Sequence, residues 1–468
     1  RNFIEAVMEK FDVVIIGGGI GGLMSAYRLA ETTALKVLLL EKGLPIEERI
    51  CPLIRNKTEK CMMCRMCSVM SGMAGAGAFS DGKYVIGTEY GGWLTDFIPK
   101  EKVMELIEEA DSVLMRFGAT DQRYLPDDEL KLKCLKYDLH MQQAVLKHLG
   151  TDDNFRTMQR LIQYLSERTE IRTLADVTDV DKGSRRVRYN YQGEEREIQA
   201  QAVLFAVGRA GSRWFAAWCA KNGVKMTSNQ VDIGVRVELP RIIWKEFAQK
   251  IYEPKIVARS KGYGDYTRMF CFNDGGEVVT ENTDGVLTVN GHSYRDPALK
   301  TENSNFALLT TTRFTEPFNE PIEYARYVAS LANKISGGGV LMQRFGDLTL
   351  GRRTNEHRMK HCNVRPTLNA VAGDLSLCMP KRQLDNIIEA IYALDNVAPG
   401  TANYDTLLYG VECKYYSSRP DCEDFRLRDC PGIYAAGDGA GFTRSLSQAA
   451  ANGLYAAEKI ARDLSSGK

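Results

Sequence analysis

Three glycines near the N-terminus, Gly17, Gly19 and Gly22, form a G-x-G-x-x-G pattern. They follow an apolar, β-branched run at 11–16, typical of a buried parallel strand, and precede residues 23–30, whose apolar side chains recur at helical spacing. In that context the first glycine permits a tight turn, the second lets the backbone approach a pyrophosphate, and the third lets helix pack on strand. The pattern therefore predicts phosphate binding at a helix N-terminus.

Glu41 ends the next apolar run, KVLLLEKG, nineteen residues after Gly22. A carboxylate at this position can accept hydrogen bonds from the ribose hydroxyls of a dinucleotide, and we group the adjacent Lys42 with it as a candidate cofactor contact. These features predict a βαβ dinucleotide-binding unit. They do not separate FAD from NAD, because both contain adenosine diphosphate.

A motif near the C-terminus distinguishes FAD from NAD. The segment PGIYAAGDGAGFTRSLSQAAANG (431–453) resembles the C-terminal FAD motif of two-dinucleotide-binding-domain flavoproteins. In that motif the pair corresponding to Gly437 and Asp438 holds the ribityl chain, and the resemblance also implies cofactor contacts at Gly208 and Val177. A helix N-terminus after such a strand can stabilise negative charge on a flavin. We expect FAD.

Further motifs carry a wider resemblance, over nearly all of residues 8–465, to a family described as FAD-dependent dehydrogenases of unknown substrate. This family is distantly similar to geranylgeranyl-reductase-type flavoproteins. The motifs are GAGAFSDGK (75–83), GTDDN (150–154), VDIGVRVE (231–238), GGEVV (275–279) and NGHSY (290–294). The chain departs from the family at GRAGSR (208–213), CFNDGG (271–276) and SGMAGAG (71–77). These departures do not affect the predicted FAD binding, but they leave the identity of the substrate open.

The glycine-rich loop 75–83 directly follows the βαβ unit, and its small residues allow the backbone to approach a cofactor. We therefore expect Gly75 and Ser80 to lie against the flavin. Asp81 and Lys83 could touch the flavin or the substrate, or could be solvated loop charges.

Cys61, Cys64 and Cys67 have C-x2-C-x2-C spacing, and Cys51-Pro52 stands ten residues earlier. Four cysteines in one loop match the ligands of a [4Fe–4S] cluster. A structural zinc, a redox-active dithiol pair and free thiols are the alternative interpretations.

The sequence has no second G-x-G-x-x-G after a strand for a resident nicotinamide. Electrons would therefore come from transiently bound NAD(P)H, from an electron-carrier protein through the cluster, or from the substrate itself.

The 468 residues, 44% of them apolar, predict two domains in an α/β protein. A Rossmann-type FAD-binding domain, similar to that of glutathione reductase, is expected from residues 8–225 and 426–468, with a cysteine-rich loop at 43–98. Residues 226–425 mix strand and helix patterns and are expected to form an inserted α+β domain for substrate or interaction.

Opposite charges nearly cancel, with 61 lysines and arginines against 60 aspartates and glutamates. No global field would attract nucleic acid or an anionic membrane, and no apolar run reaches the roughly 20 residues of a membrane span. A chain of this size without an export signal is expected in the cytoplasm with reduced thiols and a small-molecule substrate.

These features favour an FAD-dependent oxidoreductase, a dehydrogenase or reductase, that moves a hydride or two electrons between flavin and an unsaturated or carbonyl-conjugated small molecule. The alternative is a non-catalytic or sensory flavin-binding protein acting through a protein or RNA partner. No catalytic residue is assigned. The weaker candidates for acid–base, thiol or anion-binding roles are Cys271, His140, Tyr294, Arg236, Arg352 and Arg353.

Overall fold

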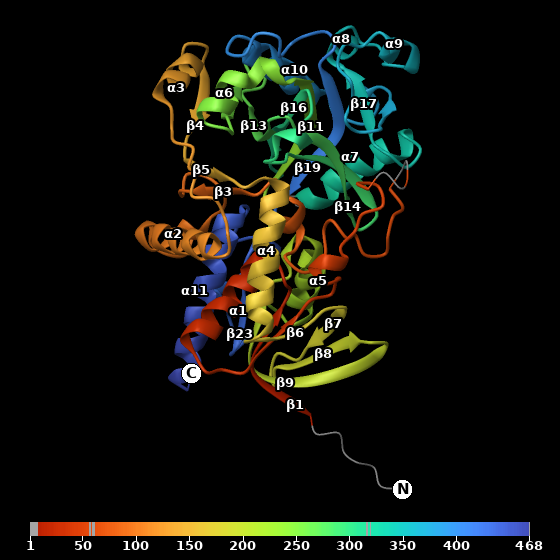
Figure 1. Cartoon of the computed structure of the whole chain (residues 1–468). Coiled ribbons are helices and arrows are strands. Elements are labelled where there is room, and N and C mark those ends of the chain that lie inside the picture. The colour runs from red at the N-terminus through yellow and green to blue at the C-terminus, as the bar shows by residue number, and fades with distance from the viewer. Residues whose placement is uncertain (1–7, 56–57, 59–60, 315–316, 319, 468) are drawn as a thin grey trace.

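The computed structural model of the chain describes residues 8–55, 58, 61–314, 317–318 and 320–467. Two large β-sheets lie one above the other in Figure 1, the lower one next to the N-terminus and the upper one built largely from the middle of the chain. No helix in these described ranges is both long and apolar enough to cross a membrane.

The lower sheet has a parallel centre. Across this centre the strands are β6 (Glu170–Arg172), β2 (Val37–Leu40), β1 (Glu9–Ile16), β9 (Glu194–Phe205) and β23 (Ile433–Ala435). Because β23 pairs with β9, the C-terminal segment completes a sheet that the N-terminal strand begins. The sheet is extended by β7 (Ala175–Val180), β8 (Arg186–Tyr191), β21 (Cys422–Glu423) and β22 (Arg426–Leu427), all in antiparallel pairs.

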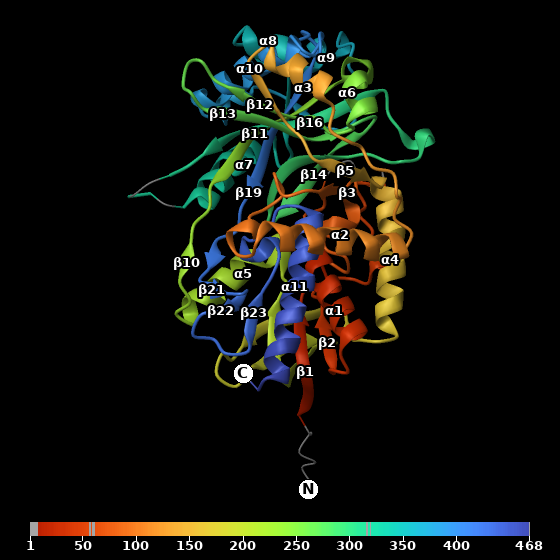
Figure 2. The same ribbon diagram turned by 90° about the vertical axis from the view of Figure 1, so that its left-hand side faces the viewer.

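Helices α1 (Ile20–Thr32) and α11 (Leu446–Ser465) lie side by side against this sheet, beside α2 (Lys100–Arg116), as Figure 2 shows. Further helices here are α4 (Gly150–Ser166) and α5 (Gly208–Lys221). Parallel strands with helices packed on them form a Rossmann-type α/β fold. The fold class predicted from the sequence is therefore confirmed.

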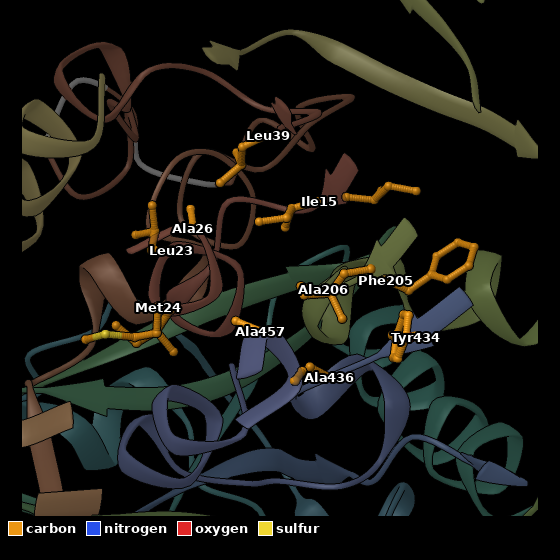
Figure 3. Close-up of a cluster of buried hydrophobic side chains, with 14 of the residues drawn as sticks. Ile15, Leu23, Met24, Ala26, Leu39, Phe205, Ala206, Tyr434, Ala436 and Ala457 are labelled. Carbon is orange, nitrogen blue, oxygen red and sulfur yellow. The ribbon is translucent and has the colours of Figure 1, made fainter. Parts of the chain in front are cut away.

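Figure 3 shows the core between sheet and helices. Ile15, Leu39 and Phe205 come from three neighbouring strands, and they are buried together with Leu23 of α1 and Ala457 of α11. The strand residues are apolar without alternation because the parallel strands are covered on both faces.

The upper sheet has eight strands. In order they are β18 (Val371–Ala372), β17 (Leu341–Arg344), β19 (Leu407–Tyr415), β11 (Val231–Pro240), β16 (Asn303–Thr312), β13 (Tyr266–Asn273), β12 (Lys255–Arg259) and β4 (Leu139–Gln142). Its helices are α3 (Asp128–Leu135), α6 (Lys245–Lys250), α7 (Pro321–Ile335), α8 (Phe345–Thr349), α9 (Glu356–Lys360) and α10 (Lys381–Asp395). Residues 128–142, which the predicted division assigns to the FAD domain, lie on this upper sheet.

Three small pairs of strands complete the fold: β3 (Lys83–Ile86) with β5 (Val145–His148), β10 (Met226–Thr227) with β20 (Arg419–Pro420), and the hairpin of β14 (Glu277–Thr283) and β15 (Val286–His292). Figure 1 places β3 and β5 between the two large sheets. Most of the loop 43–98 has irregular backbone, and β3 lies within it.

The contact between α1 and α11 predicts a sharp steric requirement at Gly453. A Cβ on Gly453 would lie 2.1 Å from the carbonyl oxygen of Gly21 in α1. We expect Gly453→Ala to lower the free energy of unfolding by about 1–3 kcal/mol, the usual cost of overpacking, in urea denaturation. Gly262→Ala is the control, since the nearest atom to its added Cβ is 4.0 Å away. Equal stability of the two variants would contradict the close packing.

Candidate active site

A large cavity, of about 1040 Å³, lies where the two sheets face each other and is lined from both. Pockets for small molecules typically measure about 300–1,000 Å³, so this one has room for a dinucleotide and part of a second molecule. Ten of the eleven predicted cofactor residues line it. They are Gly17, Gly19, Glu41, Lys42, Gly75, Ser80, Val177, Gly208, Gly437 and Asp438.

The glycine pattern forms the turn between β1 and α1. Gly17 has a φ of +109°, and a Cβ on it would lie 2.3 Å from the carbonyl oxygen of Ala206. Gly19 is the N-cap residue of α1, so the first N–H groups of that helix are available to an anion. Gly22 does not line the cavity; a Cβ there would lie 2.0 Å from the Gly17 carbonyl oxygen, so it serves the packing of helix on strand.

The carboxylate of Glu41 connects three segments of backbone at the end of β2. Its Oε2 accepts a hydrogen bond from the N–H of Gly18 at 2.7 Å, and its Oε1 accepts from Gly43 at 2.7 Å and from Gly72 at 3.1 Å. These bonds hold the carboxylate beside the glycine turn. Lys42 next to it is exposed, with its Nζ 3.4 Å from Asp176.

Arg49, which the sequence analysis did not single out, organises the loop that faces the glycine turn. The buried guanidinium donates from Nη1 to the carbonyl oxygens of Met73 at 2.6 Å and Gly75 at 2.7 Å, and from Nη2 to Val69 at 2.9 Å. Burial lowers the pKa of Arg49 to about 10. A single arginine in an irregular loop has no periodic signal, which explains why sequence reasoning missed it.

The C-terminal motif meets the strand-end glycine Gly208 in the cavity. Gly208 and Gly437 both have positive φ, +61° and +79°, and a Cβ on Gly439 would lie 2.4 Å from the Gly208 carbonyl oxygen. Asp438 accepts a hydrogen bond from Thr443 Oγ1 at 2.5 Å. Burial raises the pKa of the Asp438 carboxyl, an effect that nearby Arg209 opposes.

Lys83 is one of the charged residues in the wall opposite the glycine turn. Its Nζ lies 2.7 Å from Asp81 and 3.7 Å from Glu253, and it donates a hydrogen bond to the Phe272 carbonyl oxygen. Burial lowers the pKa of Lys83, but Asp81 and Glu253 outweigh this and the net pKa is raised. Cys271 lines the cavity beside this cluster, in a left-handed conformation with φ +53°.

The remaining candidates lie elsewhere. Arg236 is fully buried, paired with Glu412 at 3.3 Å, and supports the upper sheet. Arg352 pairs with Asp347 at 2.9 Å. These two arginines and His140, Tyr294 and Arg353 do not line the cavity.

The four loop cysteines Cys51, Cys61, Cys64 and Cys67 line one small second pocket of about 30 Å³. Cys64 and Cys67 also line the large cavity, so the two spaces adjoin. Burial raises the pKa of Cys61, and the other three thiols raise it further. Across the described ranges, no three histidine, cysteine, aspartate or glutamate side chains are arranged to hold one metal ion.

Two regions of the chain match the domains of known protein families. Residues 12–48 match an FAD binding domain, and residues 230–415 match the family described as FAD-dependent protein, C-terminal domain-like. A relative from Clostridium beijerinckii, described as an uncharacterized protein, is 26% identical over 472 residues, which cover 96% of this chain and 80% of that protein. The two domain matches show that the chain is similar to FAD-dependent proteins, and they support FAD as the cofactor predicted from the sequence.

Several solved structures are also similar. Glycine oxidase from Geobacillus kaustophilus has a TM-score of 0.41 at 12% identity, with 97% of this chain and 95% of that chain covered. A flavoprotein/dehydrogenase from Cytophaga hutchinsonii has a TM-score of 0.43 at 12% identity, with coverage of 98% and 80%. L-proline dehydrogenase from P. horikoshii has a TM-score of 0.41 at 12% identity, with coverage of 99% and 95%.

The carboxylate of Asp438, which lines the cavity, is the first residue to test by substitution. We expect Asp438→Ala to weaken FAD binding by at least about tenfold, because a hydrogen bond to a charged group is typically worth about 1.5–3 kcal/mol. The flavin-to-protein absorbance ratio and FAD titration of the apoprotein measure this. Glu423→Ala, an exposed carboxylate on β21, is the matched control. Undiminished FAD affinity in the Asp438 variant would exclude Asp438 as the ribityl contact.

Proposed function

We propose that this protein is an FAD-dependent oxidoreductase that transfers a hydride, or two electrons, between FAD and an unsaturated or carbonyl-conjugated small molecule. The observation that supports this proposal is the extent of the cavity. It runs from the glycine turn, past Asp438, to a wall of the upper sheet that includes Cys271 and Lys414. A site for the cofactor alone would not need a second wall of charged groups.

The residues present fit FAD. The open space at Gly19, where the nearest atom to an added Cβ is 4.0 Å away, leaves room for a pyrophosphate at the N-terminus of α1. The carboxylates of Glu41 and Asp438 both line the cavity, as contacts with the ribose and the ribityl chain require. In this proposal the contacts are Gly17 and Gly19 at the phosphates, Glu41, Lys42 and Val177 at the adenosine, and Gly75, Ser80, Gly208, Gly437 and Asp438 towards the flavin. When bound, FAD supplies the redox chemistry, and the protein contributes position and electrostatics.

The upper sheet would hold the substrate. Lys83, Asp81 and Glu253 form a buried charge network beside Cys271, and the two carboxylates keep Lys83 protonated. Such a network can hold a substrate oxygen and exclude disordered water. The polar wall favours a substrate with charged or hydrogen-bonding groups over a long apolar chain.

The four cysteines of the loop 43–98 belong to the proposed route by which electrons reach the flavin. We propose that Cys51, Cys61, Cys64 and Cys67 hold a [4Fe–4S] cluster that receives electrons from a carrier protein. The position of all four cysteines around one pocket, and the contact of that pocket with the large cavity, support this proposal because four cysteine thiolates are the ligands of such a cluster. Transiently bound NAD(P)H is the other donor to test. A cytoplasmic location stays a prediction.

Anaerobic flavin spectroscopy tests the function. We expect the flavin bands of the holoprotein to bleach with NAD(P)H or with a reduced ferredoxin, and to return without oxygen when an enoate or conjugated carbonyl compound accepts the electrons. The flavin is the chromophore, so its spectrum reports each half-reaction directly. A flavin that neither donor reduces and no such compound reoxidises would favour the sensory alternative instead.

Metal analysis tests the cysteine proposal separately. Protein purified without oxygen should contain about four irons and matching acid-labile sulfide per chain, together with a broad absorbance shoulder. Cys64→Ser should lose this iron but keep FAD, whereas Cys422→Ser, which changes a half-buried cysteine on β21, should keep both. Stoichiometric zinc would identify a structural zinc site, and four titratable thiols without metal would exclude both metal interpretations.

A further inference from the structure

The loop that carries the four cysteines has an exposed surface that is basic and rich in methionine. Residues 49–55 and 61–67 contain three arginines and no aspartate or glutamate. The exposed side chains of these two stretches are those of Arg55, Met62, Met63, Cys64 and Arg65. Methionine side chains are flexible and polarisable, and they are common at binding surfaces. Positive charge and adaptable apolar groups therefore surround Cys64 on the outside of the protein.

A second basic segment, residues 351–365, includes α9. It contains five arginines and lysines and one glutamate, although the whole chain has 61 basic and 60 acidic residues. Two of its arginines, Arg352 and Arg358, have Asp347 as a neighbour, at 2.9 Å and 3.9 Å. The other three cations are exposed, and among the described residues no carboxylate lies within ion-pair distance of them: Arg353, Lys360 and Arg365. Their positive charge therefore faces the solvent.

Strand β14 connects the two basic segments. Near its end, Asn282 donates a hydrogen bond to the sulfur of Met63 at 3.5 Å. Near its start, the N–H of Val278 donates to Oγ1 of Thr367, two residues after the second segment, at 2.9 Å. These contact points are four residues apart on the strand, which is about 13 Å at the usual rise per residue. The two segments are therefore neighbours in space.

One hydrophobic cluster also supports both segments. Cys61 of the cysteine loop and Met359 of α9 pack against the same group of buried residues, which includes Val278 and Leu287 of the hairpin. Figure 1 shows α9 and β14 on the same side of the molecule. A standard protein interface covers about 800 Å² on each partner, or roughly 30 Å across, so one partner can contact both segments. We call the exposed residues of the two segments the basic face.

We propose that the basic face is the docking surface for a small acidic one-electron carrier protein, such as a ferredoxin. The inference rests on the proposed function and specifies where the carrier binds. Opposite charges around a small apolar centre favour fast and weak association, which suits a carrier that must bind and leave repeatedly. Each reduced carrier gives up one electron, so two successive dockings supply the two electrons of FAD reduction, and the protons come from the solvent.

RNA is the other anionic macromolecule that a basic surface attracts. Proteins hold single-stranded RNA largely by stacking its bases on aromatic side chains that alternate with basic ones. Residues 49–55, 61–67 and 351–365 contain no phenylalanine, tyrosine or tryptophan. The exposed methionines beside Cys64 suit a protein partner better than nucleic acid, and RNA binding is therefore an outcome of the test.

Calorimetric titration of the oxidised holoprotein with a strongly acidic, oxidised two-[4Fe–4S] ferredoxin measures docking without turnover. We expect saturable one-to-one binding whose affinity falls at least about tenfold between about 50 mM and about 300 mM salt. Salt screens the attraction between exposed charges, so the affinity of an electrostatic complex must fall in this range.

Charge-reversal variants locate the docking surface. Arg55→Glu and Arg353→Glu should each weaken ferredoxin binding at least about threefold, and the double variant at least about tenfold, with FAD content unchanged. Lys360→Glu is a second variant on α9, in case Arg353→Glu loses FAD. Lys10→Glu is the matched control, because it reverses an exposed cation at the start of β1, at the opposite end of the molecule in Figure 1. It should leave ferredoxin binding unchanged.

Three results would overturn the inference: no binding of the ferredoxin, binding that neither salt nor the charge reversals weaken, or tighter binding of a mixed-sequence single-stranded RNA that the same variants lose. The last result would assign the basic face to nucleic acid. The proposed function fails by a different observation. If the ferredoxin docks as expected but does not bleach the flavin when reduced, the docking surface stands and the electron route is rejected. If reduced ferredoxin bleaches wild type and double variant at equal rates, the route stands and the surface is rejected.

Discussion

The buried carboxylate of Glu41 is the interaction on which the arrangement of the site depends. It accepts hydrogen bonds from three backbone N–H groups, of Gly18, Gly43 and Gly72, that belong to three separate turns. A buried carboxylate is tolerated only when such donors satisfy it, so the charge and the turns stabilise each other. The result is a rigid cradle at the carboxyl ends of β1 and β2, where parallel α/β sheets bind their ligands.

Arg49 holds the loop 43–98 in a similar way, by hydrogen bonds from a buried charged side chain to the backbone. Its guanidinium donates to carbonyl oxygens of residues 68–75, and it thereby holds an irregular loop against the glycine turn. Backbone without regular secondary structure needs such partners, because its own polar groups would otherwise be buried unpaired. The cysteine pocket lies in this loop, so its position beside the large cavity depends on the same arginine.

The two sheets contribute different chemistry to one cavity. The lower sheet supplies glycine turns and strand ends that suit a dinucleotide, whereas the upper sheet supplies charged side chains such as Lys414, whose buried partner Glu412 also pairs with Arg236. A buried carboxylate that contacts two cations is fully compensated. This division explains how one cavity can hold a cofactor and a second molecule.

The sequence by itself determined the fold class and the turns that line one side of the cavity. Gly17, Gly19, Glu41 and the Gly437-Asp438 pair stand at fixed distances from strands and helices, and local spacing suffices to predict such turns. Only the tertiary structure decided which charges meet. Arg444 and Asp232 form an ion pair although they are more than two hundred residues apart in the chain, and no periodic pattern relates them. Their approach results from packing of the upper sheet on the lower, which is a long-range property that local spacing does not contain.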